Sequence, residues 1–339
     1  MKRKIIVSLV AALAAVLPVH QSQAKDCRGV YEITQTDETS FGSYLAWNDT
    51  NIHGILIRET WAHVEPAKDR FHWTDITNTL TNYAQVYSKT VIISIDCGIS
   101  LAPSWIYTDG AGSFTLSDGQ TIAPWDATAQ SFLTSLFSHL SSKFDRDTTV
   151  VAVTMWCGGT AIECNFCDPN QPSDKANLDN LAGGTGLGGN YWLAGAKAIV
   201  PMYSGFFNTT IYLATGNPYP DSNSTMQALV HYFNGYWGGT NGLGLQSNGL
   251  TITHPSPTSQ TFPHCNTTAC DTYTGKIGFQ SAHAYSNVPG DGTCAQKLTN
   301  AQNHHARWVE IYSGDINQDV TSNSENGIKN FNTYAAGLP

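Results

Sequence analysis

The chain of 339 residues carries 17 basic and 26 acidic side chains, which gives a formal net charge of −9 at pH 7. An acidic chain without a cluster of Lys and Arg is a poor binder of nucleic acid or of an anionic membrane surface, so neutral ligands are expected instead. Only 13% of the residues are charged, and Ser, Thr, Asn and Gly supply much of the polar surface, as is common in exported proteins.

Residues 1–24 have the three parts of a secretory signal peptide. Lys2, Arg3 and Lys4 give a positive start, Ile5–Leu17 is an apolar run too short to anchor in a bilayer, and Ser22-Gln23-Ala24 offers a cleavage site. We therefore expect a mature chain of residues 25–339 that is exported, either secreted or periplasmic. No membrane association is expected after the signal is removed.

All eight cysteines lie in the expected mature chain, and an even number in an oxidising compartment favours disulfide bonds. The short separations of Cys164 from Cys167 and of Cys265 from Cys270 make these pairs the easiest loops to close. A zinc site built from the same four cysteines is an alternative, although the spacing of the second pair does not fit the usual ligand pattern. No other cofactor is indicated.

Apolar runs typical of buried strands alternate with helical patterns along the mature chain. In chain order we expect strands at Gly29–Ile33 and Gly54–Ile57, a helix at Asp75–Tyr87 with Thr74 as its N-cap, a strand at Val91–Ile95, a helix at Ala127–Phe144, a strand at Val150–Trp156, a loop over residues 168–189, a helix at Tyr191–Phe206, a strand at Thr210–Ala214, a helix at Thr225–Tyr236, a weak strand at Leu243–Leu245 or Leu250–Ile252, a strand at Lys276–Ser281, a helix at Gln296–Ala306, a strand at Arg307–Tyr312 and a helix at Ile328–Ala336.

Strands that alternate with helices predict a parallel sheet, and the number of strands is sufficient to close a (β/α)8 barrel of the TIM type with decorated loops. The chain has no internal repeat and no linker, so residues 25–339 are expected to form a single domain. The alternative is an open, doubly wound sheet. We disfavour it because no Gly-x-Gly-x-x-Gly turn follows the first strand.

Two carboxyl groups are the candidate catalytic residues. Glu163 lies in the loop after the strand at Val150–Trp156, and Glu310 lies on the last strand with Trp308 and Tyr312 at the same parity. Two carboxylates that face each other across a barrel mouth can cleave a glycosidic bond. One protonates the leaving oxygen, and the other captures or stabilises the oxocarbenium-like centre or activates water. We assign Glu163 as general acid/base, unless it is a solvated loop residue, and Glu310 as nucleophile or base.

Other polar and aromatic residues near the ends of the expected strands are candidates for binding a saccharide, since flat apolar rings stack on sugar faces. Each Trp could instead belong to the core, and the Arg could instead pair with Glu59 or Glu163. No Gly-x-Ser-x-Gly or His-Glu-x-x-His motif indicates a serine hydrolase or a metalloprotease. The substrate-binding candidates are Arg58, Trp61, Asp96, Trp105, Trp156, Gln280, His283 and Tyr312.

The segment Gly54–Ile76, GILIRETWAHVEPAKDRFHWTDI, resembles clan A glycoside hydrolases, especially family 42 β-galactosidases. In that family a strand with Arg is followed by Trp, by Glu-Pro and by an aromatic segment that opens a helix. Here these positions hold Arg58, Trp61, Glu65-Pro66 and residues 71–73, and the likeness extends to residue 163. The resemblance implies a (β/α)8 barrel, retaining hydrolysis of an oligo- or polysaccharide, and an acid/base at Glu163.

Two positions depart from the family pattern. Ile162 stands where the family carries an Asn, and Gln280 stands where the family nucleophile, a Glu at the end of the seventh strand, is expected. Glu310 can supply the second carboxylate only if the strand count shifts by one or if that group has moved to the eighth strand. A barrel that binds glycans without cleaving them is therefore an alternative from another class, and a disulfide-rich structural export protein is a third.

Overall fold

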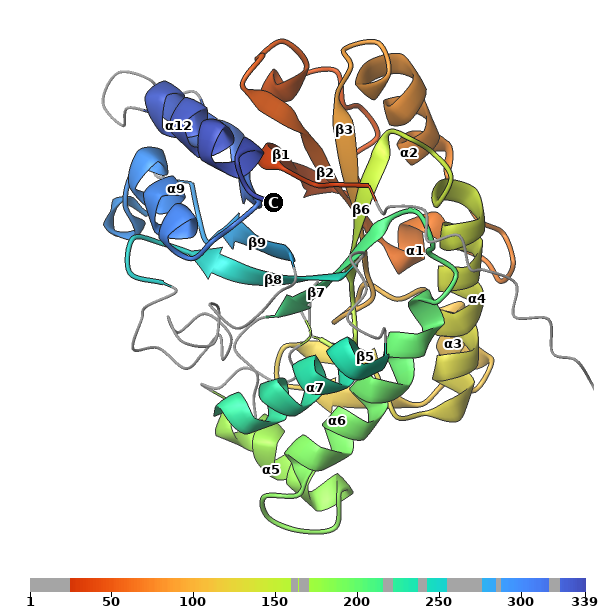
Figure 1. Cartoon of the computed structure of the whole chain (residues 1–339). Coiled ribbons are helices and arrows are strands. Elements are labelled where there is room, and N and C mark those ends of the chain that lie inside the picture. Colours follow the sequence, from red (N-terminus) through yellow and green to blue (C-terminus); the bar gives the residue numbers. More distant parts are fainter. Residues whose placement is uncertain are drawn as a thin grey trace, which may run out of the picture.

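The computed structural model describes residues 25–159, 164, 171–215, 222–236, 243–254, 276–284, 288–316 and 324–339. In this part of the chain eight parallel strands form a closed barrel in the order β1-β10-β9-β8-β7-β6-β3-β2 (Figure 1). The predicted (β/α)8 barrel is confirmed, and the open sheet is excluded. The barrel strands are β1 Gly29–Thr36, β2 Ile52–Thr60, β3 Thr90–Asp96, β6 Val150–Met155, β7 Thr210–Thr215, β8 Leu243–Leu250, β9 Lys276–Ser281 and β10 Trp308–Ile311.

Helices surround the barrel and connect its strands (Figure 1). The last helix, α12, packs against α9 and against β1, which brings the two ends of the described chain together. All the predicted helices are present, with boundaries shifted by a few residues. The longer helices are α2 Thr74–Thr79, which continues as a π-helical turn at Leu80–Ala84, α4 Ala127–Phe144, α5 Pro172–Leu181, α6 Gly188–Ile199, α7 Ser222–Tyr236, α9 Cys294–Asn303 and α12 Ser324–Ala336, and the short ones are α1 Trp61–Val64, α3 Trp105–Thr108 and α10 Ser313–Ile316.

The expected loop over residues 168–189 is wrong for the part that forms α5. Pro172 occupies the first turn, where its missing N–H costs nothing, and Leu178 is buried. The carboxylate of Asp174 accepts hydrogen bonds from the backbone N–H and the hydroxyl of Ser117, at 2.9 and 2.8 Å. Tertiary contacts therefore stabilise a helix that its own polar sequence does not indicate.

Ser117 belongs to the turn of a hairpin that was not predicted. Its antiparallel strands are β4 Ser113–Leu116 and β5 Gly119–Ile122, and they lie outside the barrel sheet.

The predicted N-cap at Thr74 is also wrong, because α2 begins at Thr74 and its N-cap is Trp73, whose side chain makes no capping hydrogen bond.

Large aromatic rings fill the half of the barrel interior nearer the amino ends of the strands. Tyr31, Tyr212 and Trp308 pack edge to face there, beside aliphatic residues of β2 and β3. The neighbouring strands make room with glycines: a Cβ on Gly244 would lie 2.1 Å from the Tyr212 ring, and one on Gly278 would lie 2.1 Å from the Trp308 ring. Because this end is filled, polar chemistry inside the barrel is confined to the carboxyl ends of the strands.

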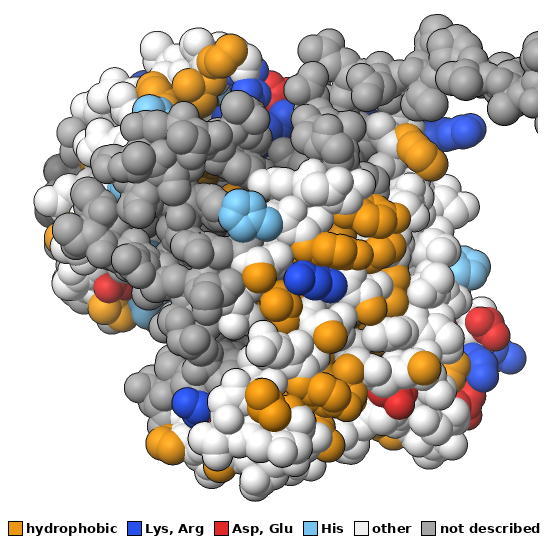
Figure 2. Space-filling view, turned by 60° about the horizontal axis from the view of Figure 1, so that its bottom comes forward, with side chains coloured by type: hydrophobic (Ala, Val, Ile, Leu, Met, Phe, Trp, Pro, Cys, Tyr) orange, Lys and Arg blue, Asp and Glu red, His pale blue; other side chains and the backbone are white. Residues whose placement is uncertain are grey.

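Figure 2 shows that hydrophobic side chains occur in groups on one face of the molecule, and that charged side chains are few and scattered. This distribution agrees with the small charged fraction of the sequence, 13%. Within the described residues, no helix has both the length and the hydropathy needed to span a bilayer.

Candidate active site

A layer of polar side chains lies inside the barrel above the aromatic rings. Side chains alternate across a strand, so the residues that follow Leu56, Ile92, Ala152 and Trp308 by two positions also face the interior. They lie toward the carboxyl ends of the strands, where the active sites of parallel barrels are found. We call this group the polar layer; it comprises Arg58, Ser94, Asp96, Thr154, Gln246, Gln280, Glu310 and Tyr312.

Glu310 is the fully buried carboxyl group of the polar layer, with an exposed fraction of 0%. Gln246 donates a hydrogen bond from Nε2 to Glu310 Oε2 at 3.3 Å, and Glu310 Oε1 has no hydrogen-bond partner among the described residues. Burial raises the pKa of Glu310 well above its ordinary value, and the positive charge of Arg58 opposes this rise. The carboxyl group is therefore one that can hold a proton beyond the usual range of Glu.

Arg58 joins the polar layer to the barrel mouth. Its guanidinium NH2 group lies 3.4 Å from Asp96 Oδ2, and Asp96 Oδ1 accepts a hydrogen bond from Ser94 at 3.0 Å. The Arg58 side chain is 22% exposed while that of Asp96 is 1% exposed. The alternative pairing of Arg58 with Glu59 is not found, because alternation along β2 turns Glu59 to the opposite side of the sheet, where it contacts His63.

Gln280 and Tyr312 complete the layer on β9 and just after β10. Gln280 hydrogen-bonds Tyr312, whose pKa is raised mainly by burial, and Gln280 pairs in register with Glu310. Since Gly29–Thr36 and Leu243–Leu250 are both barrel strands, β9 is the seventh strand and β10 the eighth. The seventh strand thus presents an amide, and Glu310 lies on the eighth.

The predicted tryptophans lie outside the polar layer. Trp61 is 0% exposed and donates a hydrogen bond from its indole nitrogen to Glu65 Oε2 at 2.7 Å. Trp105, packed edge to face against Trp61, donates to the backbone oxygen of Glu65 at 2.9 Å. Trp156 is 1% exposed and donates to the backbone oxygen of Gly159 at 3.0 Å. The packing supports a core role for the buried rings of Trp61 and Trp156.

His283 follows β9 and faces solvent. Its side chain is 58% exposed, and its Nδ1 lies 2.8 Å from Asp291 Oδ2. The structure therefore brings together Arg58, Asp96, Gln280, Glu310 and Tyr312 among the predicted site residues, and places His283 apart from them.

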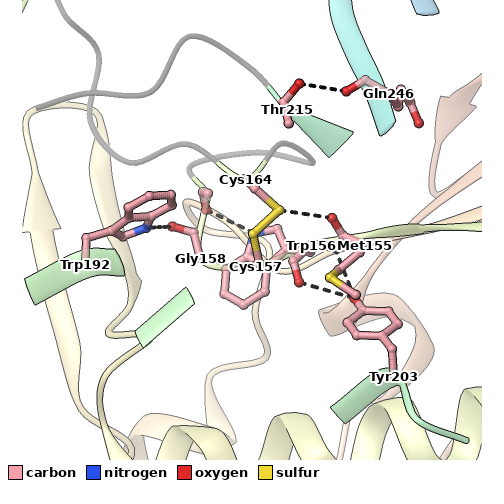
Figure 3. Close-up of a disulfide and its surroundings, with 10 residues drawn as sticks. Met155, Trp156, Cys157, Gly158, Cys164, Trp192, Tyr203, Thr215 and Gln246 are labelled. Carbon is pink, nitrogen blue, oxygen red and sulfur yellow. Dashed lines mark hydrogen bonds between the residues drawn. A yellow bond between two sulfur atoms is a disulfide. The ribbon is translucent and has the colours of Figure 1, made fainter. Parts of the chain in front are cut away.

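A disulfide between Cys157 and Cys164 ties the chain after β6 to the end of that strand (Figure 3). Cys164 also donates its backbone N–H to the oxygen of Ala214 on β7 at 2.6 Å. The predicted pairing of Cys164 with Cys167 is therefore wrong. The zinc alternative loses a ligand for the same reason, because the Cys164 sulfur is already bonded.

Several predicted positions lie outside the described residues. They are Ile162, Glu163, Cys167, Cys265 and Cys270. Among the described cysteines, Cys27, Cys97 and Cys294 are buried thiols.

Gln246, Thr154 and Ser94 belong to the polar layer but were not predicted. Gln246 is the described hydrogen-bond donor to Glu310, and its strand was only weakly indicated by the sequence. The available signal was alternation: Gly244, Gln246 and Asn248 share one side of β8 while Leu245 is buried on the other. Polar residues on the inner side of an expected barrel strand are candidates for the site.

Comparison with solved structures finds the same barrel fold in proteins of very different sequence. No family model and no curated protein sequence matches the chain. The catalytic domain of β-amylase from Paenibacillus polymyxa superposes with a TM-score of 0.63 at 12% identity, over 93% of this chain and 100% of that chain. At such identity the likeness shows the barrel fold.

Two β-galactosidases have the same barrel. The enzyme from Rahnella sp. R3 superposes with a TM-score of 0.56 at 12% identity, over 93% of this chain and 57% of that chain. The enzyme from the psychrophilic Marinomonas ef1 gives a TM-score of 0.51 at 9% identity, over 91% of this chain and 59% of that chain. This chain thus spans less than two thirds of either β-galactosidase chain.

Proposed function

We propose that this protein is an exported glycoside hydrolase that uses Glu310 and Glu163 as its two carboxyl groups. The observation that carries the proposal is Glu310, a buried carboxyl group inside a closed parallel barrel, within a polar layer at the carboxyl ends of the strands. Active sites of such barrels form at this end, and cleavage of a glycosidic bond needs a carboxyl group placed there.

The polar layer supplies hydrogen-bonding groups for a sugar. Arg58 Nε, Thr154 Oγ1, Gln246 Oε1 and Gln280 Oε1 are buried and have no hydrogen-bond partner among the described residues. Buried donors and acceptors in one layer of the barrel suit a polyhydroxylated ligand, because each hydroxyl both donates and accepts. Asp96 orients Arg58, and Tyr312 closes the layer beside Gln280.

Glu163 is assigned the acid/base role. Cys164, the next residue in the sequence, is held at the barrel mouth by its disulfide to Cys157 and by its hydrogen bond to Ala214. The resemblance to clan A supports a retaining mechanism, in which Glu310 attacks the anomeric carbon and Glu163 protonates the leaving oxygen. Retention requires the two carboxyl groups to be about 5–5.5 Å apart, whereas inversion requires about 6.5–9.5 Å.

Glu310 must be ionised to act as a nucleophile or base. Its raised pKa works against ionisation, and the positive charge of Arg58 favours it. We therefore assign Arg58 as the residue that adjusts the pKa of Glu310 for the reaction.

Export is part of the proposal. The Cys157–Cys164 disulfide is typical of an oxidising compartment, and residues 1–24 have the pattern of a signal peptide. Galactosides are the first substrate class to consider, because of the sequence resemblance to family 42, and the β-amylase barrel adds amylose to the set.

A glycan-binding barrel without hydrolytic activity is the second candidate function, and Gln280 on the seventh strand is the observation that favours it. The two are separated by incubating the protein with aryl β-galactosides, amylose and plant polysaccharides, and by measuring both product release and the midpoint of thermal unfolding. Turnover of any glycoside supports the hydrolase. A higher unfolding temperature with a saccharide, but no product after prolonged incubation, contradicts it and supports the binding barrel.

A further inference from the structure

A second group of ionisable side chains lies at the end of β2, on the outer side of the barrel wall. Glu59 is 1% exposed, and Oε2 of its carboxylate lies 2.5 Å from Nδ1 of His63, four residues later in α1. Asp37, just after β1, places Oδ1 at 3.6 Å from the same Nδ1. Because Arg58 faces the interior and Glu59 the opposite side, this group is separate from the polar layer.

We propose that Asp37, Glu59 and His63 bind a divalent transition-metal ion such as Zn²⁺. One ligand atom from each residue lies within 4.8 Å of the others. Small side-chain shifts would let a single ion contact all three at the usual distances of about 2.0–2.2 Å. The imidazole nitrogen favours Zn²⁺ over Ca²⁺ or Mg²⁺, which prefer oxygen ligands throughout.

The second oxygen of Glu59 gives independent support. Glu59 Oε1 is buried and has no hydrogen-bond partner among the described residues. A buried carboxylate oxygen without a partner is unfavourable, and the contact between Oε2 and His63 leaves Oε1 unsatisfied. A cation held between Glu59 and its neighbours would neutralise the buried carboxylate and compensate for the missing hydrogen bond at Oε1.

The surrounding residues orient the proposed ligands. Thr60 donates its backbone N–H to Asp37 Oδ1 at 2.6 Å and its hydroxyl to Asp37 Oδ2 at 2.8 Å. The Thr60 hydroxyl also accepts the backbone N–H of His63 at 3.1 Å. On the far side of the ring, His63 Nε2 lies 3.7 Å from Asp75 Oδ2. With a metal on Nδ1, Nε2 carries the hydrogen and points it at a carboxylate, as metal-bound histidines usually do.

Such an ion would connect three segments of the chain directly, and a fourth through the contact of Asp75 with His63. Asp37 follows β1, Glu59 ends β2, His63 lies in α1 and Asp75 lies in α2. The site would therefore brace the end of β2 next to Arg58 without contacting the sugar itself.

The test is isothermal titration calorimetry of the full chain with Zn²⁺, after bound metal has been removed with a chelator and the chelator by dialysis. We expect one ion per chain, and we expect Glu59→Gln and His63→Gln each to lose that ion. The control His72→Gln changes an exposed histidine near this segment and should bind as the wild type does. Asp75→Ala should bind about 10–100-fold more weakly, since it removes the carboxylate that faces Nε2 and none of the proposed ligands.

Two results would overturn the proposal: no stoichiometric Zn²⁺ binding by the wild type, or equal binding by wild type and His63→Gln. If Glu59→Gln does not fold, Asp37→Asn serves instead, because the Asp37 side chain is 36% exposed. Co²⁺ substitution identifies the ligands independently. A cobalt spectrum without thiolate charge transfer supports this site, and a thiolate spectrum assigns the metal to cysteines and contradicts it.

Discussion

At the scale of single residues, Glu310 is the residue whose environment departs most from that of an ordinary surface carboxylate. Parity along the last strand predicted that Trp308, Glu310 and Tyr312 point the same way but left open whether they point inward or outward. The structure shows that they face the interior. Its partners could not be predicted. Gln246 is 64 positions away in the sequence, and only barrel closure and register bring the two side chains together.

The buried carboxyl group should make stability depend on pH. Above the ordinary pKa of Glu, the unfolded chain releases the proton while folded Glu310 keeps it, so the unfolding free energy falls as pH rises toward the raised pKa of Glu310. The slope for one proton is about 1.4 kcal/mol per pH unit. Glu310→Gln has no proton to release, so its unfolding free energy should rise relative to that of the wild type as the pH is raised. Urea unfolding from about pH 5 to about pH 8, above the ordinary pKa of Glu, measures the difference.

The surface variant Glu325→Gln controls for loss of a carboxylate, since its side chain is 49% exposed. It should parallel the wild type across the same series. Parallel curves for Glu310→Gln as well would contradict the proposed burial of a proton at Glu310.

Arg58 gives a prediction about catalysis. Its positive charge lowers the pKa of Glu310, so Arg58→Met should raise that pKa further, and the ionised form should appear only at higher pH. The acidic limb of the pH profile of kcat/KM should therefore move to higher pH in Arg58→Met. Arg58→Lys keeps the charge and should move it less. Identical limbs in all three proteins would exclude a role for Arg58 in setting this pKa.

Among the secondary-structure elements, strands with apolar runs were predicted well from the sequence. Elements that depend on tertiary contacts were not. Val150–Met155 and Lys276–Ser281 were predicted almost to the residue. Helix α5 was missed because a distant hydrogen bond, from Ser117 to Asp174, compensates for its polar sequence. The disulfide was mispaired because short sequence separation does not show where the turn at Gly158 and Gly159 directs the chain.

The glycines of β8 and β9 provide a test of the aromatic packing near the amino ends of the strands. A Cβ on Gly278 would lie 2.1 Å from the Trp308 ring, so Gly278→Ala should lower the unfolding free energy by about 1–3 kcal/mol through overpacking. The matched control is Gly235→Ala in α7, where a Cβ meets nothing within 4 Å. That variant should be neutral or more stable by about 0.5–1 kcal/mol. Chemical denaturation measures both; equal stabilities would contradict the packing described.

The disulfide links an element to the proposed chemistry. Replacing both Cys157 and Cys164 by Ser should cost about 2–3 kcal/mol of unfolding free energy, as expected for a short closed loop. Product release should fall more than the folded fraction does, because Cys164 follows Glu163 in the sequence and its disulfide holds it at the mouth. Circular dichroism and turnover on the same samples make the comparison. Unchanged turnover per folded molecule would mean that the disulfide does not position Glu163.

At the scale of the whole molecule, eight strands close on themselves and leave one end filled with aromatic rings and the other lined with polar side chains. This difference between the two ends confines the polar interior to one place in a chain with few charges. The count and order of strands were predictable from alternation of apolar runs. Under the proposed function, the choice of sugar depends on the loops at the mouth, and loop conformation follows from contacts that a single sequence does not reveal.

The role of Glu310 in the reaction is tested by kcat/KM on the best glycoside. The proteins compared are the wild type, Glu310→Gln, Glu163→Gln and the control Glu325→Gln, with folding checked by circular dichroism. We expect kcat/KM to fall about 10²–10⁴-fold in Glu310→Gln and in Glu163→Gln, and to be unchanged in Glu325→Gln. A folded Glu310→Gln protein with wild-type kcat/KM would contradict the account and make the buried carboxyl group structural.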